Sequence, residues 1–114
     1  MKFDKGLVAG SSTLLILKLL EKEDMYGYQM IEELSRRSHR TFEMQEGTLY
    51  PLLHALEKGK YLSCCQQQAP TGRMRKYYKL TKKGRELLGE KKSEWEKFHR
   101  GVEDVLSGGA LSFS

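Results

Sequence analysis

The sequence predicts an α+β fold that is mainly α, with three helices, a two-stranded hairpin and one long C-terminal helix. Three observations support this. A leucine-rich run is followed by two segments whose apolar residues recur at helical spacing. Two strand-like runs then flank a turn-rich tetrapeptide. A heptad pattern follows in the C-terminal segment, as far as Val105. With 114 residues, 39% of them hydrophobic, the chain can build one small core.

The first two helices are expected over residues 14–20 and 26–38. Residues 11–13 are Ser-Ser-Thr, which offer N-caps for the first helix. The run behind them is apolar nearly all round, which places this helix centrally. In the second helix Tyr26, Met30, Ile31 and Leu34 share one face. Residues 41–44 are expected to be an extended link.

The third helix is expected over residues 46–58. Four leucines form its core face: Leu49, Leu52, Leu53 and Leu56. Pro51 lacks an N–H donor, so the first turn should be irregular. The opposite face carries Thr48, Tyr50 and His54, and it holds little charge. A tyrosine there favours a contact surface over simple solvation, although Thr48 is also explained as a local capping hydroxyl.

Residues 61–67 and 74–80 are expected to be strands joined by a turn at 69–72. The turn and the second strand form a basic tip with Arg73, Arg75 and Lys76. Between residues 59 and 85 there are eight basic side chains and no acidic one, in a chain of net charge +5. This window holds the whole positive excess and indicates a polyanionic partner, nucleic acid first. The alternative is a solvated turn.

Thr81 is expected to cap a long fourth helix. Its apolar side chains follow a heptad repeat with one defect, Lys91, and the predicted dimer interface consists of Leu88, Trp95, Phe98, Val102 and Val105. At about 1.5 Å per residue the helix is roughly 36 Å long, so a second copy of the chain is expected to cover its stripe. The expected organisation is a first unit at 1–80, a dimerisation helix at 81–107 and a disordered tail at 108–114.

This order of elements is the plan of a winged helix-turn-helix, in which the third helix enters the major groove of double-stranded DNA. The hairpin is the wing, whose cations can neutralise phosphates. The predicted DNA-binding residues are Tyr28, Thr48, Tyr50, His54, Arg73, Arg75 and Lys76. Tyr26 is expected to pack in the core, whereas Tyr28 stays open to a phosphate contact.

Two sequence blocks carry a resemblance to a known family. They are Glu-Gly-Thr-Leu-Tyr-Pro at residues 46–51 and Gly-Arg-Met-Arg-Lys-Tyr-Tyr-Lys-Leu-Thr at residues 72–81. Together with Met-Tyr-Gly-Tyr at residues 25–28 they resemble the PadR family of bacterial winged-helix transcriptional regulators, over roughly residues 10–105. Met74 departs from the family pattern, where proline or arginine is more common.

The resemblance implies a cytoplasmic homodimer that represses genes and is released by a small molecule. In some members with a single C-terminal helix, tryptophans stack planar aromatic ligands. Trp95 matches that position, and Lys91 and Phe98 lie beside it on the predicted seam. The competing interpretation of Trp95 and Phe98 is a dimer core without a ligand.

The sequence gives little support for a secreted or membrane protein, a metal-binding protein or an enzyme. No signal peptide or membrane span is recognisable. Cys64 and Cys65 are adjacent, which excludes a C-x-x-C metal clip, and inert reduced thiols are favoured over a redox switch. The three histidines are scattered, no cofactor motif is found, and no nucleophile–base pair supports an enzyme. The alternative function is a winged-helix module that binds another protein instead of DNA.

Overall fold

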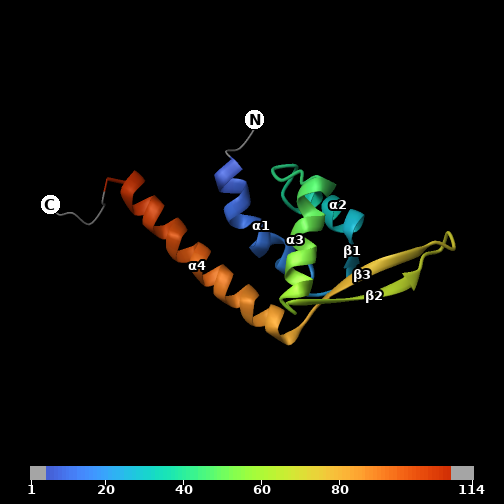
Figure 1. Ribbon diagram of the computed structural model, residues 1–114. Helices are drawn as coiled ribbons and strands as arrows, with labels where there is room; N and C mark the ends of the chain where they lie inside the picture. The colour runs from blue at the N-terminus through green and yellow to red at the C-terminus, as the bar shows by residue number, and fades with distance from the viewer. Residues whose placement is uncertain (1–4, 109–114) are drawn as a thin grey trace.

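The computed structural model describes residues 5–108 and has four helices and a three-stranded antiparallel sheet (Figure 1). The α+β, mainly α class is therefore confirmed, and so is the long C-terminal helix. The elements in chain order are α1 (Lys5–Leu19), β1 (Met25–Tyr26), α2 (Gly27–Arg37), α3 (Glu46–Lys58), β2 (Leu62–Gln68), β3 (Met74–Leu80) and α4 (Lys82–Leu106).

Helix α1 begins at Lys5, so the prediction that it starts at residue 14 behind a serine or threonine cap is wrong. The Ser11 hydroxyl donates to the carbonyl oxygen of Leu7 at 3.1 Å, four residues back. Ser11 thus satisfies its side chain inside the helix, where it caps nothing. The central position of α1 is as predicted, because Ile16, Leu17 and Leu19 are buried.

Helix α2 packs against both α1 and α3, and α2 and α3 form a helix-turn-helix. Both lie within one residue of their predicted bounds, and Tyr26 is the N-cap of α2. The core face of α3 is formed by Leu49, Leu53 and Leu56. In its first turn the Gln45 carbonyl oxygen accepts from both Thr48 N and Leu49 N, at 3.0 and 2.9 Å. Such a shared acceptor is common at helix ends, and α3 continues as an α-helix through Pro51.

The hairpin of β2 and β3 gains a third strand that the sequence did not predict. The sheet order is β1-β3-β2, with Tyr26 paired to Tyr77 and Leu62 paired to Leu80. At two residues, β1 is too short to show an alternating pattern. It ties the start of α2 to the base of the hairpin, which extends from the body on the side away from α4 (Figure 1).

Helix α4 starts as predicted and then leaves the body. The Thr81 hydroxyl oxygen accepts from Gly84 N at 3.0 Å. Gly84 must be small, since a Cβ there would lie 2.1 Å from the Tyr61 carbonyl oxygen. Every residue from 92 to 108 is exposed, and the distal end of α4 projects past α1 (Figure 1). The tail expected at 108–114 lies, apart from Gly108, outside the described residues.

Candidate nucleic-acid interface

The outward face of α3 consists of side chains that can contact DNA bases. Thr48, Tyr50 and His54 are all exposed, whereas the leucines on the other face fill the core. A helix that buries one face and presents hydroxyls and an imidazole on the other has the donors and acceptors that base edges pair with. The structure thus presents these three predicted residues together on one helix.

The Tyr50 ring crosses from α3 to the start of α2. A Cβ on Gly27 would lie 2.4 Å from the Tyr50 phenol oxygen, so a larger residue at position 27 would push the ring aside. Tyr50 still exposes 43% of its surface, and Tyr28 on α2 is also exposed. The Tyr50 ring thus lies against the first turn of α2, where the exposed Tyr28 and the backbone N–H groups are suited to a phosphate.

The tip of the wing carries one cation that is free to bind. Its turn closes through Ala69 N to the Arg73 carbonyl oxygen at 2.7 Å, and Gly72 has a φ of 90°, which favours glycine. Within residues 5–108, no side chain bonds to the Arg73 guanidinium. Met74 beside it is exposed. Arg73 is thus available to a phosphate.

The other two predicted wing cations already have partners. The Arg75 guanidinium carbon lies 4.4 Å from the Tyr26 ring centroid. That ring also meets Tyr77 edge-on, with centroids 5.4 Å apart. The Lys76 ammonium lies 3.2 Å from Glu57 Oε1, near the end of α3. The sequence could not distinguish the three cations, whereas the structure separates a free tip from an engaged base.

Glu57 accepts from two side chains of the hairpin. The Cys64 thiol donates to Glu57 Oε2 at 2.8 Å, and Lys76 donates to Oε1. These bonds, from Cys64 first and Lys76 second, lower the pKa of Glu57. The same carboxylate raises the pKa of Cys64, which opposes thiolate formation. Cys65 is exposed and, as the next residue on a strand, faces the other side of the sheet.

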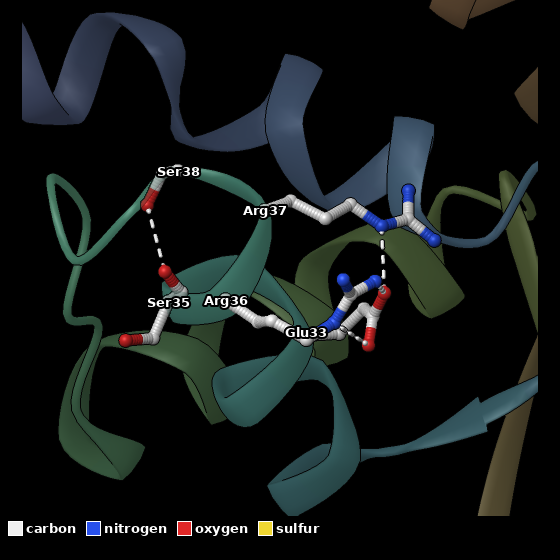
Figure 2. Close-up of polar contacts among 5 residues, drawn as sticks. All are labelled: Glu33, Ser35, Arg36, Arg37 and Ser38. Atoms are coloured by element: carbon white, nitrogen blue, oxygen red, sulfur yellow. Dashed lines mark hydrogen bonds and ion pairs between the residues drawn. The ribbon is translucent and has the colours of Figure 1, made fainter.

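A second charge cluster lies on α2, where Glu33 pairs with two arginines (Figure 2). Arg37 Nε lies 2.8 Å from Glu33 Oε1, and Arg36 binds both carboxylate oxygens. These bonds lower the pKa of Glu33 from its ordinary value to about 2. Sequence reasoning overlooked this cluster, although the i,i+3 and i,i+4 spacings are the signal that would have found it.

An apolar groove of about 760 Å³ runs between α1 and α4. Lys91, Trp95 and Phe98 line it from α4, and Leu7 and Leu14 line it from α1. The structure thus brings the three predicted ligand residues together. Lys91 lies 3.5 Å from Glu94, and Trp95 stacks on His99 with ring centroids 4.7 Å apart.

The predicted dimer residues divide into two groups. Leu88 is buried against the core of its own chain. Trp95 and Phe98 remain exposed by 45% and 67%, and Val102 and Val105 are exposed farther along α4. The last two belong to an apolar patch on the open face of α4. The distal stripe of α4 therefore stays largely uncovered by residues 5–108.

A helix-turn-helix with an exposed polar α3, flanked by a hairpin with a basic tip, defines the winged-helix class of DNA-binding folds. The model of the transcriptional regulator PadR-like family matches residues 16–90. The chain belongs to this family of transcriptional regulators. Its members bind DNA and generally act as dimers, and regulators of this kind are generally not enzymes.

Individual relatives agree with this assignment. The chain is 36% identical to the transcriptional regulator Rv3488 of Mycobacterium tuberculosis, over 82% of this chain and 80% of the other. A PadR-like transcription factor from Bacteroides fragilis superposes with a TM-score of 0.72 at 35% identity, covering 88% and 94%. A transcriptional regulator from Clostridium thermocellum gives 0.81 at 26% identity, covering 88% and 97%.

The structure also bears on metal binding and on membrane-spanning helices. Within residues 5–108, no three histidine, cysteine or acidic side chains are grouped as metal ligands would be. In the same part of the chain, no helix has the length and apolar character needed to cross a bilayer.

Proposed function

We propose that this protein is a dimeric, sequence-specific DNA-binding repressor. The observation that carries the proposal is a helix-turn-helix whose α3 exposes Thr48, Tyr50 and His54, followed by a wing whose tip carries the unpaired Arg73. A repressor with this surface would block transcription by occupying DNA that overlaps a promoter.

The contacts divide by chemistry. Thr48, Tyr50 and His54 on α3 face base edges in the major groove, where hydroxyls and an imidazole can discriminate between bases. Tyr28 and Arg73 bind phosphates on either side and set the register of the protein on the duplex. The phosphate contacts supply affinity, and the α3 contacts supply sequence preference.

The exposed stripe on α4 supports a homodimer. Trp95, Phe98, Val102 and Val105 present apolar side chains that burial against a second α4 would remove from water. A dimer built on this stripe carries two copies of α3, which can read two half-sites about 34 Å apart. Leu88 contributes indirectly, because it fixes the first half of α4 to the body.

The groove between α1 and α4 supports a small-molecule effector that relieves repression. It has apolar walls, an indole and a phenyl ring at one side and the Lys91–Glu94 pair at its edge. A planar aromatic compound fits this chemistry. Since the groove borders the proposed dimer stripe, a ligand there would alter the spacing of the two α3 helices.

The distal stripe of α4 also supports a second candidate function, a module that binds a different protein and reads no DNA. An apolar helix face does not by itself distinguish a second copy from a foreign partner. A monomer in solution without DNA affinity would favour this alternative.

The test is fluorescence anisotropy with DNA from upstream of the gene, with unrelated DNA as competitor, at several salt concentrations between about 50 and 200 mM. We expect tight binding that resists the competitor and weakens by orders of magnitude over this range. Arg73→Met should reduce the slope of log affinity against log salt by about 0.9, the value for one lost phosphate contact.

Lys92→Met is the matched control, because it removes an equally exposed cation from α4, far from the hairpin. It should leave the slope unchanged. Equal slopes for wild type and Arg73→Met would remove the wing tip from the interface. Binding that is lost completely to the competitor at low salt would contradict sequence-specific recognition.

A further inference from the structure

The hairpin is held from both faces at two consecutive residues. Arg75 stacks on Tyr26, the N-cap of α2, on one face of β3. Lys76 reaches Glu57, in the last turn of α3, on the other face. Both helices of the helix-turn-helix are thus connected to the wing at the same level of the sheet.

This level is also where the hairpin leaves the body. On the face toward α3, the paired residues Leu62 and Leu80 are buried, and Tyr78 is buried opposite a half-buried Cys64. Lys76 follows one pair farther out. Beyond it, residues 66–74 are exposed except for Ala69. Contacts at residues 75 and 76 therefore set the angle at which the free part of the wing projects.

We propose that Glu57 and Lys76 are positioning residues of the DNA interface. Glu57 holds Lys76 and Cys64, fixes the wing against α3 and keeps the Lys76 ammonium away from phosphate. The inference rests on the proposed function, since it concerns how that interface is aimed. It reassigns Lys76 from a DNA contact to an internal anchor and leaves Arg73 as the free cation of the tip.

The bond geometry around Glu57 supports this role. Its two carboxylate oxygens have separate partners on adjacent strands, at 2.8 Å from Cys64 Sγ and 3.2 Å from Lys76 Nζ. Both partners come from the hairpin and the acceptor comes from α3, so a change in wing angle must stretch one or both bonds. An ion pair this exposed adds little to the free energy of unfolding. Its loss should therefore change the direction in which the wing projects and leave the fold intact.

The DNA-binding test uses Glu57→Gln, which keeps the side chain's shape and removes its charge. Released Lys76 can then reach a phosphate, so the salt slope should steepen by up to about 0.9. Affinity for unrelated DNA should rise, and the ratio of specific to non-specific affinity should fall several-fold. Glu90→Gln on α4 changes net charge equally at an exposed site and should leave both quantities unchanged.

Lys76→Met provides the complementary variant. An anchor that does not touch DNA predicts an unchanged salt slope together with a reduced specificity ratio. A slope reduced as in Arg73→Met would overturn the proposal, because Lys76 would then be a phosphate contact. An unchanged slope and an unchanged ratio in both Glu57→Gln and Lys76→Met would overturn it as well.

A readout without DNA separates this inference from the proposed function. In a Cys65→Ser background, we expect Glu57→Gln to speed alkylation of Cys64 by iodoacetamide at neutral pH, because the carboxylate that raises the Cys64 pKa is gone. If the rate of Cys64 alkylation is unchanged in a variant that still binds DNA, the anchoring role of Glu57 is overturned and the proposed function stands. Faster alkylation in a protein that binds no DNA would overturn the proposed function together with the DNA role of Glu57.

Discussion

The two ends of α4 differ in how much of their surface the rest of the protein covers. Near its start, Gly84 packs on the Tyr61 backbone and Leu88 is buried in the core. From residue 92 to residue 108 every residue is exposed, including Trp95 and Phe98. One continuous helix is thus half packed into the body and half free.

This difference separates two tasks that a single heptad pattern joins in the sequence. The proximal half of α4 completes the core, and the leucines of this core are buried against one another within one chain. The distal half carries apolar side chains that residues 5–108 leave between 40% and 80% exposed. Such a stripe is retained where a partner buries it. The following predictions test this division, from the largest effect to the smallest.

The largest effect is expected from Leu53→Ala on α3. Leu53 is fully buried, so its removal should destabilise the fold by about 2–5 kcal/mol. The matched variant is Leu106→Ala, which removes the same atoms from a side chain that is 80% exposed. Urea unfolding of both proteins at a concentration where they are monomeric checks this. Similar losses for the two variants would contradict the division between body and distal helix.

The second effect concerns assembly. Trp95→Glu combined with Phe98→Glu should convert dimers into monomers, because two charges would have to be buried at the stripe. Light scattering measures the mass, and circular dichroism should show an intact fold. Ser93→Glu with Arg100→Gln makes the same change in charge on the opposite face of α4, and dimers should persist. Persistent dimers in the Trp95/Phe98 variant would place the dimer contact elsewhere.

The smallest effect concerns the charge cluster of the body. The folded protein holds the pKa of Glu33 near 2, below its ordinary value. The stabilisation is therefore fully present above about pH 4.5 and is lost as pH falls toward 2. We expect Glu33→Gln to lower the melting temperature slightly at pH 6, and we expect its difference from wild type to shrink as pH falls from about 4.5 toward 2.

Glu32→Gln is the control for that measurement, because it removes the same charge from an exposed position next to Glu33 on the same helix. It should follow the wild-type profile. A constant difference between Glu33→Gln and wild type at every pH would assign the effect to helix propensity instead of the ion pairs.

Much of the fold could be predicted because its signals are local. The leucine spacing of α3 and the cap at Thr81 depend on residues within a turn of each other, and both predictions hold. The start of α1 could not be read in the same way. Ser11 is as compatible with a hydroxyl bond inside a helix as with a cap, and only the full helix decides between them.

The sequence predicted which residues belong to the candidate site. It did not predict which of its cations are free and which are engaged by other side chains. Arg73, Arg75 and Lys76 look equivalent in sequence, because each is a cation near a turn. Their roles differ through contacts with residues 49 and 19 positions away, Tyr26 for Arg75 and Glu57 for Lys76. Such long-range partners leave no periodic signal. Strand β1, which brings Tyr26 to the sheet, has only two residues and therefore leaves no periodic signal in the sequence either.

The measurement that tests the account most directly is hydroxyl-radical footprinting of the protein on its upstream DNA, combined with a stoichiometric titration. A dimer joined through distal α4 predicts two protomers per site and two protected half-sites about 10 base pairs apart. One protected half-site bound by one protomer would contradict the central claim that the distal helix pairs two DNA-reading bodies.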